Sequence, residues 1–250
     1  MIQVEGFSKL YAEFVAVDDL SFDVQPGAVM GLVGPNGAGK TSTLRCLSGI
    51  IPPTKGRLRV GGFDLATQPI EAKRQIAFFS DTPKLFEYLT VRQHLAFVAR
   101  IYQVRDAATI GQSLLEELEI AEKADKLPAE LSHGMRQKLA IACGLLHSPS
   151  VIYFDEPLTG LDPFGIRRMK NSILKRARDG AAIIVSSHLL PLVEEICSHL
   201  LILKKGKKIV HGPLDEIRKQ FLAESGSTNL EELFFRVAGE GEAETPEGPP

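Results

Sequence analysis

Hydrophobic and polar positions alternate along the first third of the chain, which is the pattern of half-buried strands. Residues 17–24 alternate in this way, whereas residues 28–33 are apolar throughout and predict a fully buried strand. Two more strands are predicted at 57–60 and 76–79, and the glycine pair at 61–62 marks a turn between elements. This part of the chain is therefore expected to form sheet.

Between residues 90 and 146 the spacing of apolar positions changes to that of amphipathic helices. Thr90 is placed to cap a first helix, a second helix contains residues 114–118, and a third helix begins at Ser132. The spacing predicts that this mostly helical stretch, roughly residues 82–148, is a subdomain inserted into the sheet domain.

Apolar strands return at 151–154 and 182–186, separated by a helix of ten or more residues. This alternation is typical of βαβ units, in which a mainly parallel sheet carries helices on both faces. The predicted fold class is α/β: a mainly parallel sheet with antiparallel strands at the N-terminus and an inserted helical subdomain. A short amphipathic helix is predicted at 230–237, and the acidic stretch 239–250, rich in Gly and Pro, is predicted to be a disordered tail.

Composition narrows the class of protein. The chain has 250 residues, enough for one large α/β domain or two small ones, and 29 Lys+Arg are balanced by 31 Asp+Glu. A net charge of −2 argues against a dedicated nucleic-acid binder, so no nucleic-acid partner is expected. The basic run at 204–208 is typical of a solvated hairpin tip, because apolar runs flank it on both sides.

The start of the chain does not have the pattern of a signal peptide, and no apolar run approaches the ~18 residues needed to span a bilayer. The three cysteines are widely separated in predicted helices, so we expect reduced core residues: Cys46, Cys143 and Cys197. We therefore expect a cytoplasmic protein.

A glycine-rich loop follows the buried strand at 28–33 and precedes an amphipathic helix. It matches the phosphate-binding pattern GxxxxGK(S/T), and the predicted ATP-binding residues are Gly34, Pro35, Asn36, Gly37, Ala38, Gly39, Lys40, Thr41 and Ser42. The glycines let backbone N–H groups wrap phosphates, and the helix start adds its positive end. Lys40 supplies charge to the β- and γ-phosphates, and the Thr41 hydroxyl is placed for Mg²⁺. The alternative is a Gly-rich turn that ends in Lys-Thr by chance.

A second carboxylate-bearing motif follows the apolar strand at 151–154. Asp155 stands at the carboxyl end of this strand, where such folds hold Mg²⁺ beside a triphosphate, and Glu156 comes next. Glu156 can orient the attacking water or accept its proton. Many strands end in acidic turns, so the motif alone is weak. Together with the glycine-rich loop it predicts ATP hydrolysis with Mg²⁺.

Four further stretches resemble the ATP-binding-cassette (ABC) ATPases, and the resemblance covers nearly the whole chain. Residues 131–137, LSHGMRQ, are similar to the family's LSGGQ signature, and residues 156–163 are similar to the stretch that leads into its D-loop. His188 stands after a buried strand in the place of the family's switch histidine, and Tyr11 stands where the family places an adenine-stacking aromatic. The resemblance implies a P-loop NTPase-type fold, with residues 1–238 as one ABC ATPase domain.

The resemblance also implies how the site is completed. In this family the helix end carrying Ser132 and Gly134 faces the γ-phosphate bound by a partner subunit, and two chains pack head-to-tail around two ATP molecules. It implies γ-phosphate contact for His188 and places Asp162 in the D-loop. On the residues alone, Ser132 could be a plain helix cap, His188 a buried strand-end histidine and Tyr11 a core residue.

The chain departs from the family pattern at a few positions. His133 replaces the first signature glycine and Met135 replaces the signature glutamine, while Ser132 and Gly134 are retained. Asp81 stands where the family often has glutamine; it is shorter and charged, and it can still reach Mg²⁺ or its water shell.

The function that the resemblance implies is the ATPase subunit of a membrane transporter, and the export branch is the most similar. Its partners would be ATP, a separately encoded integral membrane permease and a second ATPase subunit, identical or not. It would lie at the inner face of the cell membrane. The alternatives are a soluble ABC ATPase not coupled to transport and a nucleotide-binding regulatory module without turnover.

The segment 81–89 carries large apolar residues in a loop-like stretch: Leu85, Phe86 and Tyr88. Loops normally run over the surface, where such residues are poorly hidden. In the family this loop borders a groove that receives a helix of the permease, so we expect a docking surface. The alternative is that Leu85 and Phe86 fold back under the helix that starts after Thr90.

Overall fold

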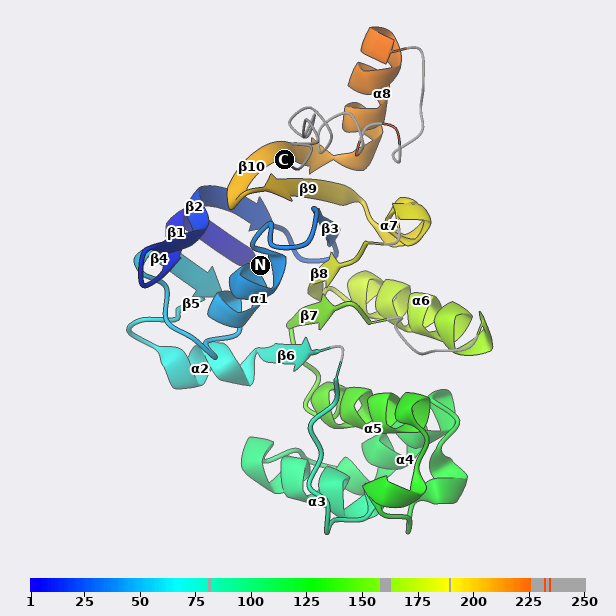
Figure 1. The fold of residues 1–250 in the computed structure, drawn as a ribbon. Helices are drawn as coiled ribbons and strands as arrows, with labels where there is room; N and C mark the ends of the chain where they lie inside the picture. The colour runs from blue at the N-terminus through cyan, green and yellow to red at the C-terminus, as the bar shows by residue number, and fades with distance from the viewer. Residues whose placement is uncertain (81, 158–162, 189, 226–231, 233, 235–250) are drawn as a thin grey trace, which may run out of the picture.

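The computed structural model describes residues 1–80, 82–157, 163–188, 190–225, 232 and 234, and within them the strands form two sheets (Figure 1). The antiparallel sheet has the order β2 (Phe14–Val24), β1 (Ile2–Tyr11), β4 (Lys55–Val60) and β5 (Phe63–Asp64). The second sheet has the order β10 (Lys207–Pro213), β9 (His199–Lys204), β3 (Val29–Val33), β8 (Ala182–Ser186), β7 (Val151–Asp155) and β6 (Ile76–Phe79). Strands β6, β7, β8, β3 and β9 run parallel, and β10 pairs antiparallel with β9. The predicted α/β class is confirmed.

The parallel strands are buried on both faces, which explains their unbroken apolar sequence. Side chains of successive strand residues point to opposite faces, so Ile152 and Phe154 enter one core while Tyr153 enters the other. In β3, Val29 and Met30 divide in the same way. The sheet therefore separates two hydrophobic cores.

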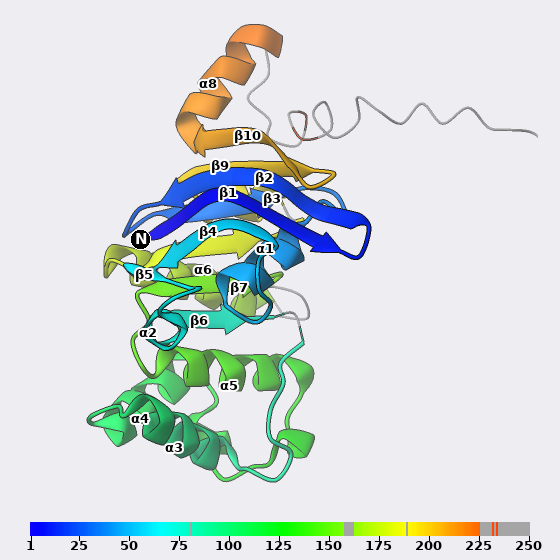
Figure 2. The ribbon, with the colours of Figure 1, turned by 90° about the vertical axis from the view of Figure 1, so that its left-hand side faces the viewer.

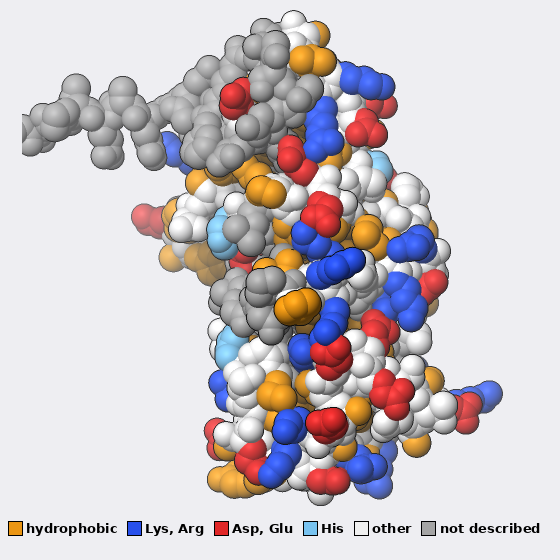
Figure 3. Space-filling view, turned by 90° about the vertical axis from the view of Figure 1, so that its right-hand side faces the viewer, with side chains coloured by type: hydrophobic (Ala, Val, Ile, Leu, Met, Phe, Trp, Pro, Cys, Tyr) orange, Lys and Arg blue, Asp and Glu red, His pale blue; other side chains and the backbone are white. Residues whose placement is uncertain are grey.

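Helices cover both faces of this sheet. The helix α1 (Lys40–Leu47) packs Leu44 and Leu47 into the core shared with the antiparallel sheet, which faces the viewer in Figure 2. The opposite core takes Met169 and Ile173 of α6 (Pro163–Arg178) and Val193 of α7 (Leu190–Ile196). The remaining core-domain helices are α2 (Pro69–Arg74) and α8 (Leu214–Ser225). Figure 3 shows the face formed by α6 and α7, where basic and acidic side chains are interspersed.

Three helices lie between β6 and β7 in the sequence and contact one another: α3 (Val91–Tyr102), α4 (Ala107–Glu117) and α5 (His133–Leu145). Two short 3₁₀ turns, Ala121–Lys123 and Pro128–Glu130, connect α4 to α5. The predicted caps are present. Thr90 and Gln93 form a reciprocal capping box at the start of α3, and the Ser132 hydroxyl accepts from the Met135 N–H at 3.3 Å.

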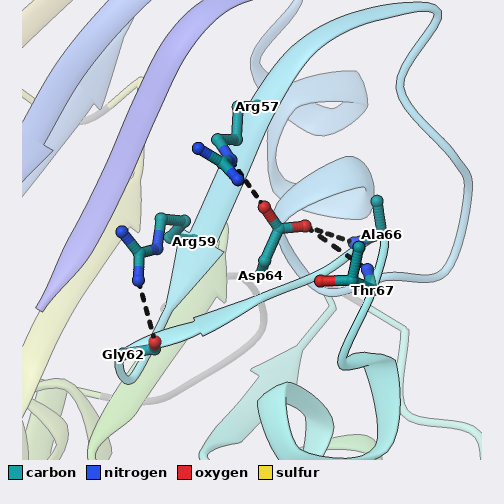
Figure 4. Close-up of polar contacts among 6 residues, drawn as sticks. All are labelled: Arg57, Arg59, Gly62, Asp64, Ala66 and Thr67. Atoms are coloured by element: carbon teal, nitrogen blue, oxygen red, sulfur yellow. Dashed lines mark hydrogen bonds and ion pairs between the residues drawn. The ribbon is translucent and has the colours of Figure 1, made fainter.

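An ion pair between the exposed Arg57 and the buried Asp64 joins β4 to β5 at the edge of the antiparallel sheet (Figure 4). The Arg57 Nε donates to the Asp64 carboxylate at 2.7 Å, and the other carboxylate oxygen accepts from the Ala66 N–H at 2.9 Å. The hydrogen bond from Arg57 is the largest cause of the lowered pKa of Asp64. The strands β4 and β5 are joined by Gly61 and Gly62, so the predicted turn is a tight hairpin.

The cysteines are free thiols, as predicted, but one of them lies outside a helix. Cys46 lies in α1 and Cys143 in α5, whereas Cys197 follows the last residue of α7. The correction arises because α7 ends early, where the chain enters β9. Burial raises the pKa of Cys143 and Cys197 to about 12, so these thiols stay protonated near neutral pH.

Several predictions fall on residues that the structure does not describe: Asp81, Asp162, most of the helix at 230–237 and the tail at 239–250. None of the helices within the described ranges has the length and apolar character that a bilayer crossing requires.

Candidate nucleotide site

The glycine-rich loop connects β3 to α1 at the carboxyl end of the parallel sheet, where ligands bind in such folds. Gly39 has a φ of 102°, and a Cβ there would lie 2.5 Å from the Ala16 carbonyl oxygen, so only glycine fits. No side chain caps the start of α1. Its first N–H groups are therefore available to an anion.

Lys40 folds back across the loop. Its ammonium donates to the Gly34 carbonyl at 2.6 Å and to the Pro35 carbonyl at 3.1 Å. Burial lowers the pKa of Lys40, although the charges of Glu156 and Asp155 act in the opposite direction. Phosphate oxygens are stronger acceptors than these carbonyls, so a bound triphosphate would draw the ammonium to itself.

The two predicted carboxylates lie beside this loop. Asp155 is the last residue of β7 and is buried, and the Glu156 N–H donates to the Ser186 carbonyl of β8 at 3.0 Å. Glu156 has a φ of 54°, which is uncommon for a residue with a side chain. Its carboxylate accepts from Nδ1 of His188 at 2.8 Å. The fold thus brings the predicted catalytic pair into contact.

A cavity of about 280 Å³ is lined by residues from three parts of the chain. One wall is formed by Tyr11, Phe14 and Ala16, and the rest comes from residues 36–42 with Asp155 and Glu156. The Tyr11 hydroxyl lies 3.5 Å from the Ser42 hydroxyl, and the Lys9 ammonium lies 5.0 Å from the centroid of the Tyr11 ring. Tyr11 is therefore a wall of the cavity and not a core residue.

Phe14 also lines this cavity, although no sequence motif marks it. It is 62% exposed and pairs across the strands with Tyr11. The sequence shows that Phe14 lies three residues after Tyr11, but only the β1–β2 register places the two residues side by side.

The residues in this cavity fit Mg²⁺. Thr41 and Asp155 both line it, and a hydroxyl with one carboxylate is a set of hard oxygen donors. In the described part of the chain, no three His, Cys, Asp or Glu residues gather around a possible metal position. The Thr41 hydroxyl and the Asp155 carboxylate suit Mg²⁺, which is commonly held by one or two protein oxygens together with substrate phosphates.

The signature residues stand apart from this cavity. Ser132 and Gly134 lie at the start of α5, and neither lines the cavity of the same chain. The plain capping role of Ser132 is confirmed by its hydrogen bond to the helix. Further along α5, Gln137 is buried and its Nε2 donates to the Pro157 carbonyl at 2.9 Å, which joins α5 to the residue after Glu156. Gln137 ends the stretch that resembles the family signature, but no local signal marks its contact, because its partner is a backbone carbonyl distant in sequence.

A second, larger cavity of about 850 Å³ lies beside the first; Thr41, Asp155 and Glu156 line both. Its outer part is lined by Ile50, Phe86 and Phe97, and we call it the apolar groove. The ring of Phe86 meets that of Phe97 edge-on, with centroids 5.0 Å apart.

The segment before α3 only partly folds back. Leu85 is half-buried and packs against the main core, but Phe86 is 55% exposed and Tyr88 is 88% exposed. The Phe86 N–H donates to Nε2 of His94 at 3.0 Å, while Nδ1 of His94 donates to the Thr90 carbonyl at 2.8 Å. The buried His94 therefore holds the segment by its backbone and leaves the two aromatic rings outside.

A mainly parallel α/β sheet with a glycine-rich phosphate loop, an adjacent lysine and two strand-end carboxylates defines a P-loop nucleotide-binding protein. The family model of the ABC transporter matches residues 17–159. The chain is 31% identical to the ABC-type transporter ATP-binding protein EcsA of Bacillus subtilis, over 96% of this chain and 97% of the relative. The protein belongs to the ABC transporter family, as an ATP-binding subunit.

Two further similarities agree with this assignment. The bacitracin transport ATP-binding protein BcrA of Bacillus licheniformis is 34% identical, over 97% of this chain and 77% of the relative. A solved structure of the ATP-binding subunit of an ABC transporter superposes with a TM-score of 0.89 at 33% identity, covering 95% of this chain and 99% of that one. Subunits of this family bind ATP, carry ATPase activity in general and work with membrane permease components.

Proposed function

We propose that this protein hydrolyses ATP with Mg²⁺ and powers an exporter whose membrane permease is a separate chain. The observation that carries the proposal is the pairing of Glu156 with His188 beside the phosphate loop, at 2.8 Å. A regulatory module without turnover would not need this pair. The similarity to a bacitracin transport protein supports a role in transport, and the resemblance of the signature region to the export branch supports its direction.

The roles of the residues follow from their positions. The loop N–H groups and Lys40 bind the triphosphate, and Tyr11 stacks on the adenine. The Thr41 hydroxyl and the Asp155 carboxylate hold Mg²⁺, which neutralises phosphate charge when bound. Glu156 orients a water molecule and accepts its proton, while His188 holds the Glu156 carboxylate in place and contacts the γ-phosphate.

The signature residues imply a second subunit. Since Ser132 and Gly134 do not line the cavity of their own chain, we propose that they contact ATP bound by a partner in a head-to-tail dimer. The start of α5 is an exposed helix N-terminus, which favours an anion. Asp162 of the D-loop would lie at the same interface.

The proposal extends to the division of the chain and to its place in the cell. We propose one ATPase domain over residues 1–238, with residues 82–148 as a helical subdomain. A short helix of the permease would occupy the apolar groove, because a groove lined with large apolar side chains suits an amphipathic helix. The subunit would then lie at the inner face of the membrane without entering it.

The variant Glu156→Gln tests this proposal. It should bind ATP as wild type does, lose roughly 100-fold or more in hydrolysis, and accumulate as an ATP-bound dimer in size-exclusion chromatography with ATP and Mg²⁺. Glu122→Gln, an exposed change on a 3₁₀ turn, is the control. Normal hydrolysis by Glu156→Gln would exclude Glu156 as the base. A monomer at high protein concentration would overturn the dimer, and a wild type that binds but never hydrolyses ATP would favour the regulatory module.

A further inference from the structure

The hairpin between β9 and β10 carries the basic run at 204–208, and its tip contacts the phosphate loop. Lys204 pairs with Lys207, and the two turn residues have left-handed φ values, 49° for Lys205 and 78° for Gly206. The Gly206 N–H donates to the Ala38 carbonyl at 3.1 Å, and the Gly206 carbonyl accepts from the Asp18 N–H at 2.9 Å. One residue of the turn is thus bonded both to the phosphate loop and to β2.

These contacts leave no room for side chains. A Cβ on Gly206 would lie 2.9 Å from the Ala16 carbonyl oxygen, and a Cβ on Gly34 would lie 2.3 Å from the Leu203 carbonyl oxygen. Three segments that are distant in sequence therefore meet backbone to backbone: the hairpin, β2 and the phosphate loop. Glycine is required at these positions by contact as well as by conformation.

The geometry of the peptide bond gives the contact a consequence for phosphate binding. In a planar trans peptide the C=O and the N–H point in opposite directions. The hydrogen bond from Gly206 fixes the direction of the Ala38 C=O toward the hairpin. The N–H of Gly39, which belongs to the same peptide, is thereby turned away from the hairpin, and Gly39 itself lines the nucleotide cavity.

The lysines of the hairpin contribute to this arrangement as tethers. The Lys208 ammonium donates to the Ser21 carbonyl at 2.6 Å, and the Lys207 ammonium lies 3.4 Å from the Asp18 carboxylate. Both partners lie on β2, the strand that also forms one wall of the nucleotide cavity. Lys207 and Lys208 therefore tether the hairpin to β2. The basic run lies at a hairpin tip, as the sequence predicts.

We propose that Gly206 is a positioning residue for ATP binding: through Ala38 it presets the direction of the Gly39 N–H, so that the phosphate loop needs little reorganisation when ATP binds. This inference rests on the proposed function, since it takes the loop to be the ATP site. It assigns to the β9–β10 hairpin a part in nucleotide affinity.

The chain contains a matched control for the test. Gly62 is also the second residue of a two-residue hairpin turn, with a φ of 90°, but a Cβ there meets nothing within 4 Å (Figure 4). Alanine at either position has to adopt the left-handed conformation, and only at Gly206 does it also press on the backbone of β2 beside the phosphate loop.

The experiment compares Gly206→Ala and Gly62→Ala by titration with a fluorescent ATP analogue and by steady-state ATPase kinetics. Gly206→Ala should weaken ATP affinity roughly tenfold and raise KM, with kcat at saturating ATP changed less than about threefold, because the loop is preset less well but the catalytic pair is untouched. Gly62→Ala should keep wild-type affinity. Equal affinities in the two variants, at comparable melting temperatures, would overturn the proposal.

Three outcomes are distinguishable. If Gly206→Ala does not fold, Lys208→Ala decides: the proposal requires a two- to threefold loss of ATP affinity, roughly the effect of one exposed tether, and unchanged affinity overturns it. If wild type itself fails to bind ATP, it is the proposed function that fails. If wild type binds and Gly206→Ala binds equally well, only the positioning role of Gly206 fails.

Discussion

The nucleotide cavity and the apolar groove share a border but are built in opposite ways. The cavity is built around the tight backbone of the phosphate loop, where a Cβ on Gly39 would collide with the Ala16 carbonyl oxygen, and charged side chains converge on it. In the groove, large exposed side chains come from the turn after α1 (Ile50), the segment before α3 (Phe86) and α3 itself (Phe97). Where the backbone leaves no room for a Cβ, few substitutions are tolerated. A surface made of side chains can bind a different partner when those side chains are substituted.

The shared border gives the two regions a common set of atoms. Thr41, Asp155 and Glu156 line both cavities. In addition, Gln137 of α5 donates to the carbonyl of Pro157, directly after Glu156. A rearrangement around the triphosphate would therefore move residues that also line the groove, without a long chain of intermediate contacts.

The largest effect is expected from Lys40→Ala, which should abolish the function of the nucleotide cavity and leave that of the apolar groove intact. ATP affinity should fall roughly 100-fold, because a charge-assisted contact to the phosphates is lost. Capture of the permease through the groove should stay at the wild-type level, since Lys40 does not line that surface. Lys123→Ala is the control, and titration with a labelled ATP analogue alongside co-purification measures both properties. Loss of permease capture together with ATP binding would show that the regions are not separable.

The converse change is Phe86→Glu, in the apolar groove, or Tyr88→Glu, two residues further along the same exposed segment. Both rings are more than half exposed, so the isolated subunit should melt within a few degrees of wild type and bind ATP normally, yet fail to assemble with its permease. Ile70→Glu adds the same charge at an apolar residue that is 66% exposed but lies on α2, outside the segment before α3, so assembly should survive there. A large fall in melting temperature for both Phe86→Glu and Tyr88→Glu would instead place these rings in the core.

The smallest effect is expected where α4 of the helical part meets α6 of the sheet part. Glu117 accepts from Arg176 at 2.8 and 3.1 Å and from the Ser172 hydroxyl at 3.0 Å. Burial alone would raise the pKa of Glu117, but these hydrogen bonds and the nearby positive charges outweigh it and leave the pKa lowered.

Because the folded-state pKa of Glu117 is lowered, its contribution to stability is present above the unfolded-state pKa and is lost as the pH falls through the folded-state value. The free energy of unfolding of Glu117→Gln should be about 1 kcal/mol lower than wild type at neutral pH, and the gap should close below roughly pH 4. Glu116→Gln, its exposed neighbour, is the control in urea titrations at several pH values. A gap that stays constant with pH would mean that packing, and not the charge of Glu117, joins the two helices.

Local patterns determined a large part of this protein. The buried strands at 28–33, 76–79, 151–154 and 182–186 were predictable within a residue or two, because both faces of each are covered and the apolar run has no interruption. The caps at Thr90 and Ser132 were predictable for the same local reason, since a side chain bonds an N–H three residues away. The phosphate loop is the strongest case, because its chemistry resides in consecutive backbone N–H groups.

Only the tertiary structure decided which distant residues meet. The contacts of Gly206 with Ala38 and of Gln137 with Pro157 join segments whose sequences carry no mark of one another. The exposure of Phe86 depends on the buried His94, whose ring nitrogens hydrogen-bond to the backbone of Phe86 and Thr90 and leave the Phe86 ring outside the core. In both contacts the acceptor is a backbone carbonyl, a group that every residue possesses, so the sequence does not specify them; the packing of the two cores does.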